Sequence, residues 1–186
     1  MKHISQLLAV AFIALITVSS ESGAQKSYAL GIGGGVAFPV GKLSDTQTTG
    51  LNGLVSLAVG VAELPIGIRI DAIYNGLPQK NVAPPASGSS NTSSFRIVGL
   101  LGNAIYAFSG TGAKTYVIAG GGLYNTHLDV SGSKSENHLG LNAGAGVTFG
   151  LGPIAGFIEA RYHFISRQPA QGGVIHFVPI TIGFMF

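Results

Sequence analysis

The sequence predicts an all-β protein, an eight-stranded antiparallel transmembrane up-and-down β-barrel, and three observations lead to this prediction. First, 46% of the residues are hydrophobic and only 9% are charged, far below the usual charged quarter of a soluble domain. Second, no apolar run after residue 24 is long enough for a membrane-spanning helix, and hydrophobic residues instead alternate with small or polar ones. Third, the connections between alternating stretches are short and long in turn, which is typical of a barrel with tight turns at one rim.

The beginning of the chain is typical of a secretory signal peptide. A positive start precedes an apolar run over residues 7–18, and small residues precede a cut that we place after Ala24. At about twelve residues the run is too short for a membrane-spanning helix, and no Cys follows it, which excludes a lipoprotein anchor. The expected organisation is therefore a cleaved signal peptide, 1–24, and one barrel domain, 25–186, exported through the general secretory pathway.

Alternation in steps of two divides the rest of the chain into eight expected strands. Their ranges, in order, are 28–38, 51–61, 66–74, 95–108, 115–126, 139–149, 155–165 and 178–186. The first strand has an aliphatic and aromatic face that runs from Tyr28 to Phe38, and a second face made only of Gly and Ala. The second strand continues the pattern, with Leu51 and Val55 on its outward face.

The middle strands differ from one another in the chemistry of their faces. The third is the first to carry charges, because Arg69 and Asp71 alternate with an outward face of Ile and Tyr. The fourth is apolar on both faces, so the sequence leaves open which face points outward, and a β-bulge could shift the alternation partway along the strand. The fifth has Tyr116, Ile118 and Tyr124 on one side.

The sixth and seventh strands return to a clear alternation. The sixth places Leu, Ala, Val and Phe opposite Gly, Asn and Thr. The seventh places Glu159, Arg161 and His163 opposite an apolar face that includes Tyr162 and Phe164. Both strands therefore fit a barrel wall with lipid on one side and a lumen on the other.

The eighth strand ends on an aromatic residue with no polar tail after it. Ile182, Phe184 and Phe186 share its apolar face. An exposed Phe at the end of a strand suits a lipid-facing rim better than a free edge in water. The pattern resembles the C-terminal insertion signal of bacterial outer-membrane β-barrels, and this resemblance implies that the barrel assembly machinery reads these residues during biogenesis.

Aromatic residues cluster near the strand ends, where amphipathic rings would lie at the level of the lipid headgroups. We expect two girdles, one at each rim. The long-loop girdle comprises Phe38, Tyr74, Tyr124 and Phe164, and the short-turn girdle comprises Phe108, Tyr116, Phe149, Phe184 and Phe186.

The inward charges of the third and seventh strands form a concentrated ionisable set: Arg69, Asp71, Glu159, Arg161 and His163. These strands face each other across an eight-stranded ring, whose interior is just wide enough for side chains to fill. We therefore expect a lumen charge network that closes the channel, since buried charges must be paired. The alternatives are a gated pore, a proton-responsive site at His163, and catalysis.

Four segments carry a wider resemblance: 33–41, 120–125, 159–163 and 178–183. In order and spacing they resemble the outer-membrane β-barrel superfamily of small eight-stranded proteins, which is related to the OmpA transmembrane domain and the opacity proteins. The resemblance covers the chain after the signal peptide. It implies the outer membrane of a Gram-negative bacterium, with outer-membrane lipids and lipopolysaccharide as partners. We expect no peptidoglycan-binding domain after Phe186.

The expected role is structural or surface-displaying, with no catalytic residue, cofactor or metal. The runner-up is a narrow, gated, porin-like pore for ions or small solutes, and the third possibility is an outer-membrane lipid-modifying enzyme. Some eight-stranded barrels are lipid A deacylases with a His and a Ser on one face. His163 and Ser166 are three apart and point to opposite faces, so we reject that assignment. The net charge of +3 is spread thinly, which argues against nucleic acid as a partner.

Overall fold

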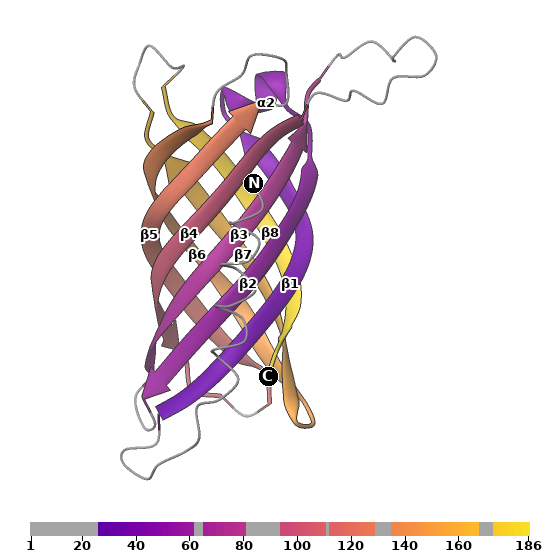
Figure 1. Ribbon diagram of the computed structural model, residues 1–186. Coiled ribbons are helices and arrows are strands. Elements are labelled where there is room, and N and C mark those ends of the chain that lie inside the picture. The colour runs from indigo at the N-terminus through magenta and orange to yellow at the C-terminus, as the bar shows by residue number, and fades with distance from the viewer. Residues whose placement is uncertain (1–25, 62–64, 81–93, 111, 129–134, 168–172) are drawn as a thin grey trace, which may run out of the picture.

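A computed structural model describes residues 26–61, 65–80, 94–110, 112–128, 135–167 and 173–186 of the chain. The expected signal peptide and much of the expected loop 75–94 lie outside these residues. The described strands form one closed barrel in which β1 to β8 follow one another around the ring in chain order (Figure 1). The eight-stranded antiparallel architecture predicted from the sequence is confirmed. Within the described residues, no helix has both the length and the apolar character needed to cross a membrane.

Most of the strands run somewhat longer than the alternation alone predicts, and β4 has the predicted length but begins and ends one residue earlier. Their bounds are β1 (Lys26–Val40), β2 (Gly50–Val61), β3 (Ile66–Pro78), β4 (Ser94–Ala107), β5 (Lys114–Leu128), β6 (Glu136–Leu151), β7 (Ile154–Ile165) and β8 (Ile175–Met185). A one-turn helix, α2 (Leu43–Thr46), lies in the first long connection. In Figure 1, α2 lies at the opposite end of the barrel from the chain's C-terminus.

The barrel closes between its first and last strands, as the sequence predicts. β1 pairs antiparallel with β8 from Gly31 opposite Met185 to Val40 opposite His176. The last residue extends this pairing, because the backbone N–H groups of Leu30 and Phe186 each donate to the other residue's carbonyl, at 3.0 and 2.8 Å. Closure matters because an open strand edge in lipid would leave backbone groups unsatisfied, at several kcal/mol each.

The turn between β6 and β7 is short and depends on a glycine. Leu151 pairs with Ile154, which leaves a two-residue turn whose first residue, Gly152, has φ of 75°. Only Gly adopts this conformation without strain.

The register of β4 against β3 is continuous from Ser94 to Tyr106, so no bulge resets the alternation of β4.

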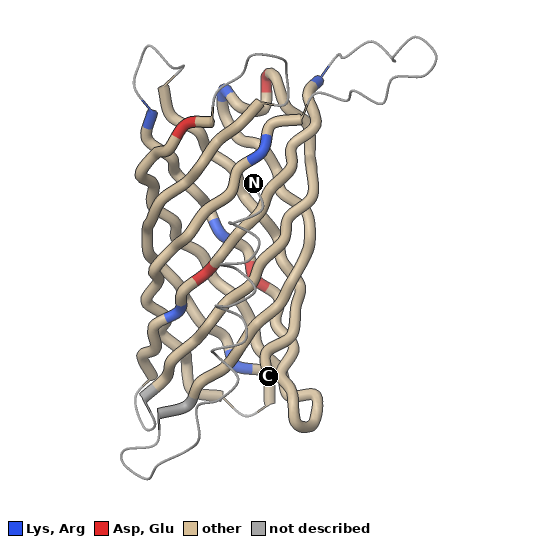
Figure 2. The backbone as a smooth tube through the Cα atoms, in the orientation of Figure 1, with Lys and Arg blue, Asp and Glu red and all other residues tan. Residues whose placement is uncertain are grey.

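The two faces of the wall differ as predicted. Outward side chains such as Ile68, Leu139 and Phe186 have exposed fractions of 64%, 70% and 60%. The inward faces of β3 and β7, which carry Arg69 and Glu159, are almost fully buried. Figure 2 shows that charged positions are sparse on the barrel, with one group partway along it and others near both ends, most of them at the end where α2 lies.

The girdle prediction is wrong for two residues. Tyr116 and Tyr124 are only 5% and 0% exposed, and both face the lumen. Glycine makes room for them, since a side chain at Gly146 would overlap the Tyr116 ring, and one at Gly140 would lie 2.6 Å from the Tyr124 ring. Their hydroxyl groups also find polar partners inside the barrel. The other predicted aromatics with large exposed fractions are Phe38, Tyr74, Phe108, Phe164, Phe184 and Phe186.

Candidate functional site in the barrel lumen

Four charged side chains from opposite walls meet in the lumen and form a closed ring of alternating sign. We call Arg69, Asp71, Glu159 and Arg161 the charge ring. Arg69 Nη2 lies 2.7 Å from Glu159 Oε2, and Arg161 Nε lies 2.8 Å from Glu159 Oε1. Arg161 Nη1 lies 2.7 Å from Asp71 Oδ2, and Arg69 Nε lies 2.9 Å from Asp71 Oδ1. Each charge thus touches two of opposite sign, and the formal charges cancel.

The ring is buried, and its carboxylates receive further hydrogen bonds. The four side chains are between 0% and 3% exposed. Asn103 Nδ2 on β4 donates to Asp71 Oδ2 at 2.9 Å, and the Tyr116 hydroxyl on β5 donates to Glu159 Oε2 at 2.7 Å. Buried ion pairs offset their desolvation only when such extra bonds satisfy the remaining lone pairs. The arrangement therefore ties β3 and β7 across the barrel and links them to β4 and β5.

Between the charge ring and the long loops, a group of apolar side chains packs inside the lumen, and the polar side chains of Gln47, Thr126 and His138 are also buried towards that end. We call Leu77, Phe95, Ile97, Ile165, Ile175 and Phe177 the apolar layer, and none of them is more than 8% exposed. Each lies near the long-loop end of its strand. On the other side of the ring, Phe157 is 1% exposed and fills space left by Gly33 and Gly183. The ring thus lies between apolar groups along the barrel axis.

The architecture matches that of solved membrane barrels. Neisserial surface protein A superposes with a TM-score of 0.64 at 18% sequence identity, over 87% of this chain and 97% of that one. A major outer membrane protein from Thermus thermophilus superposes with a TM-score of 0.55 at 12% identity, over 87% of this chain and 98% of that one.

The chain has the fold of the small outer-membrane β-barrels. No family model matches the sequence, and no curated protein matches it. The likeness therefore rests on the closed eight-stranded architecture and gives the fold alone.

In this small outer-membrane barrel fold, His163, the fifth residue of the predicted lumen charge network, lies outside the charge ring. It is fully buried on the inward face of β7, as its parity predicts. Its Nδ1 lies 2.9 Å from the Tyr124 hydroxyl, and its ring stacks on Phe177 with centroids 4.6 Å apart. It thus belongs to the boundary between the ring and the apolar layer. Ser166 is exposed beyond the end of β7, so it does not face His163.

Other polar residues also line the lumen, and the sequence analysis did not single them out. Asn142 Nδ2 on β6 donates to Asn103 Oδ1 at 2.9 Å, which extends the ring's hydrogen bonds to a further strand. A separate cluster joins three strands, because Asn52 donates to Asn75 at 2.9 Å and Thr181 donates to Asn52 at 2.6 Å. All of these residues have inward parity and sit among Gly or apolar neighbours, and that signal was available in the sequence.

The predicted insertion-signal residues lie on the lipid-facing side of β8 and just after it. Ile182, Phe184 and Phe186 have exposed fractions of 57%, 45% and 60%. Their neighbours in the alternation, Thr181 and Gly183, are buried in the lumen. The three side chains thus form one apolar row at the short-turn end of the wall.

Proposed function

We propose that this chain is a bacterial outer-membrane protein with a structural or surface-display role and a lumen that the charge ring closes. The observation that carries the proposal is the ring itself: four buried charges span the barrel and leave none of the four unpaired. An ion moving along the axis would have to break these pairs and then pass the apolar layer. The large outward apolar face fits a lipid bilayer.

The proposal includes a route of export and assembly. The signal peptide would direct secretion, the barrel assembly machinery would read the terminal strand, and outer-membrane lipids and lipopolysaccharide would surround the wall. The structural neighbour Neisserial surface protein A is, by its name, a surface protein, which is in keeping with a display role. We propose no enzymatic activity, because the four charges of the ring hold one another and His163 is fully buried between the Tyr124 hydroxyl and the Phe177 ring.

Conductance tests the closed lumen. Purified wild-type protein in planar lipid bilayers should produce no steady current, because the ring and the apolar layer block the path. A long-lived, reproducible channel in the wild-type protein would overturn the proposal and support the narrow porin-like pore instead.

Surface display predicts a fixed orientation, and the absence of Cys from the sequence allows a clean test. A single cysteine in Asp45→Cys, within α2, should react with a membrane-impermeant maleimide on intact cells. The matched variant Ser109→Cys, at an exposed short turn, should react only after the cells are opened. Labelling of Ser109→Cys on intact cells, with none at Asp45→Cys, would contradict this orientation.

Assembly is tested at the last residue. Phe186→Ala should reduce the amount of barrel in the outer membrane of cells, because the assembly machinery would lose the aromatic end of the strand. The same purified variant should refold in detergent nearly as well as the wild type, since Phe186 is exposed. Phe108→Ala, an exposed aromatic at the same rim, serves as the control. Normal insertion of Phe186→Ala in cells would count against this role.

A further inference from the structure

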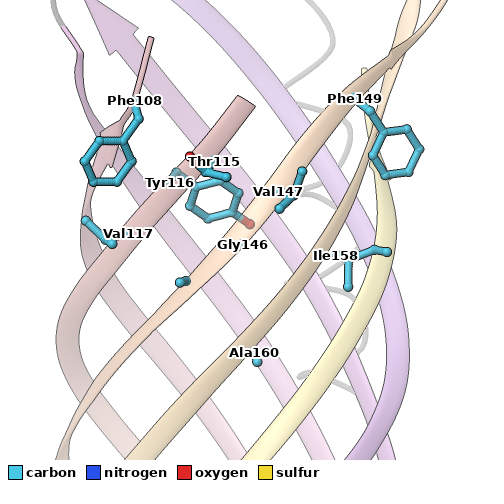
Figure 3. Close-up of a pocket in the computed structure, with 10 residues that line it drawn as sticks. Phe108, Thr115, Tyr116, Val117, Gly146, Val147, Phe149, Ile158 and Ala160 are labelled. Atoms are coloured by element: carbon cyan, nitrogen blue, oxygen red, sulfur yellow. The ribbon is translucent and has the colours of Figure 1, made fainter. Parts of the chain in front are cut away.

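Two hollows of the described barrel differ in their chemistry. One is on the outer wall across β5, β6 and β7, with Phe108 and Phe149 on opposite sides of it (Figure 3). Its lining is almost entirely hydrocarbon, so the chains of a bilayer would fill it without any selective contact. The other, which we call the mouth pocket, has a volume of about 350 Å³ and lies at the long-loop end. It is bounded by α2, by the ends of β4, β5 and β6, and by the residues just after β7.

The base of the mouth pocket is apolar. Phe95 belongs to the apolar layer, and Leu43 of α2 and Leu128 of β5 pack against the same core. All three residues line the pocket, and we call them the apolar base. The apolar layer and the charge ring lie beneath it, so a molecule in the pocket would have to pass both to cross the barrel.

Two residues of opposite charge line the same pocket: Arg167, just after β7, and Glu136, which begins β6. Arg167 Nε donates to the carbonyl of Gly173 at 3.2 Å, and this bond uses one of the five N–H donors of the guanidinium. Burial lowers the pKa of Arg167 from its ordinary value, and the nearby Glu136 offsets this only in part. A bound carboxylate would therefore favour the charged guanidinium further.

A third polar residue of the pocket lacks a partner. Gln47, the residue after α2, lines the pocket and is only 5% exposed. Its Oε1 has no hydrogen-bond partner among the described residues. Buried polar groups are almost always hydrogen-bonded, so this acceptor points to a bound molecule that carries an N–H or O–H donor.

We propose that the mouth pocket binds a free α-amino acid with an apolar side chain. Arg167 binds its carboxylate, Glu136 binds its ammonium, the apolar base takes the side chain, and Gln47 accepts a hydrogen bond from the ligand or from a water held with it. A simple anion would be repelled by Glu136 and a simple cation by Arg167, whereas a zwitterion matches both charges. The pocket has the volume of about twelve water molecules, which is room enough for such a ligand. The inference goes beyond the proposed function and needs only the folded barrel.

Isothermal titration calorimetry of the protein in lipid nanodiscs tests the site with four ligands. L-Leucine has the carboxylate, the ammonium and the hydrocarbon side chain together. Leucinamide lacks the carboxylate, isocaproate lacks the ammonium, and glycine lacks the side chain. L-Leucine should bind, and each of the other three should bind at least about ten-fold more weakly, because each loses either a hydrogen bond to a charged group or the buried hydrocarbon.

Two substitutions assign the charged roles by effects of opposite sign. Glu136→Gln should weaken the binding of L-leucine yet strengthen that of isocaproate, because it removes the repulsion of the carboxylate. Arg167→Gln should weaken the binding of both L-leucine and isocaproate and strengthen that of leucinamide. Asp45→Asn and Lys42→Gln, exposed charges at the same end but outside the pocket lining, are the controls and should change none of these affinities. Circular dichroism on each variant establishes that the barrel is folded.

Any of four results would overturn the proposal. The absence of L-leucine binding at millimolar concentration would remove the site. Isocaproate or leucinamide binding as tightly as L-leucine would mean that the pocket selects a single charge, and equal binding of glycine would mean that the apolar base plays no part. Wild-type affinity for L-leucine in both Glu136→Gln and Arg167→Gln would place the amino acid elsewhere. Failure here leaves the conductance and labelling results untouched, so the two proposals are tested separately.

Discussion

Two neighbouring parts of one lumen are filled by opposite chemistry. The charge ring, towards the short turns, is held by directional ion pairs and hydrogen bonds, whereas the apolar layer, towards the long loops, is held by burial alone. Both are almost inaccessible to solvent. Loss of one ring member leaves a buried charge without its partner, while loss of an apolar side chain leaves only a void. The same degree of burial therefore gives the two layers different sensitivity to change.

The two layers also differ in how strictly they fix the strand register. Arg69 and Asp71 are two residues apart, so they share a face, and a slip of one residue would turn both towards lipid. A one-residue slip of β4 would not move a charge of the ring into lipid, because β4 is apolar on both faces. Its register is marked by Asn103, the one polar side chain on its inward face, which binds Asp71 and Asn142. We infer that the ring specifies pairing and the apolar layer supplies bulk.

The largest expected effect comes from removing one ring member. Glu159→Ala would leave Arg69 and Arg161 with Asp71 as their only ring partner, and a buried charge that loses its partner costs about 3–5 kcal/mol. Urea unfolding in detergent, followed by circular dichroism, measures this loss. If water enters the gap instead, the loss is smaller and the planar-bilayer conductance rises.

Asp45→Ala, at an exposed position in α2, is the matched control for Glu159→Ala and should leave the unfolding midpoint unchanged. A Glu159→Ala protein with wild-type stability and wild-type conductance would show that the ring neither stabilises nor closes the barrel. The distinction between the two layers would then fail.

The strands differ in how well their inward and outward faces could be predicted from the sequence. Alternation correctly predicted the faces of β3 and β7, because charged and apolar residues alternate there without exception in the middle of each strand. It failed on β5, where Tyr116 and Tyr124 are amphipathic and suit either a headgroup girdle or a lumen with polar partners. Whether the lumen had room for them depended on Gly146 and Gly140 on the next strand, and one strand's pattern does not contain that information.

The apolar layer was missed for a related reason. The rule that lipid-facing residues are apolar and inward ones polar holds at the charge ring, but the inward Phe95, Ile97 and Phe177 break it. An eight-stranded lumen is narrow enough for side chains to fill, so it has a packed core like that of a soluble protein. Apolar residues on both faces of a strand, as in β4, are the sequence signal of that core.

The second effect concerns the apolar layer alone. Ile97→Ala should cost about 2–5 kcal/mol, from lost burial and the cavity that remains. Planar-bilayer current should stay at the wild-type level, because the charge ring is intact. Val98→Ala, the outward neighbour on β4, is the control and should cost much less, since lipid replaces the lost contacts. A current through Ile97→Ala would show that the apolar layer, rather than the ring, closes the lumen.

The smallest expected effect compares one hydroxyl in the ring with one on the outer wall. Tyr116 donates to Glu159 at 2.7 Å, and the Tyr162 hydroxyl lies 2.8 Å from His176 Nδ1 on the outward face. Tyr116→Phe should cost about 1.5–3 kcal/mol, the range for a hydrogen bond to a charged group. Tyr162→Phe should change stability by less than about 0.5 kcal/mol, as exposed substitutions usually do, because water or a lipid headgroup can replace the lost partner. Urea unfolding of both variants under one condition measures the difference. Equal costs would mean that Glu159 is satisfied by its two arginines alone, and that the ring's link to β5 adds nothing to the stability of the barrel.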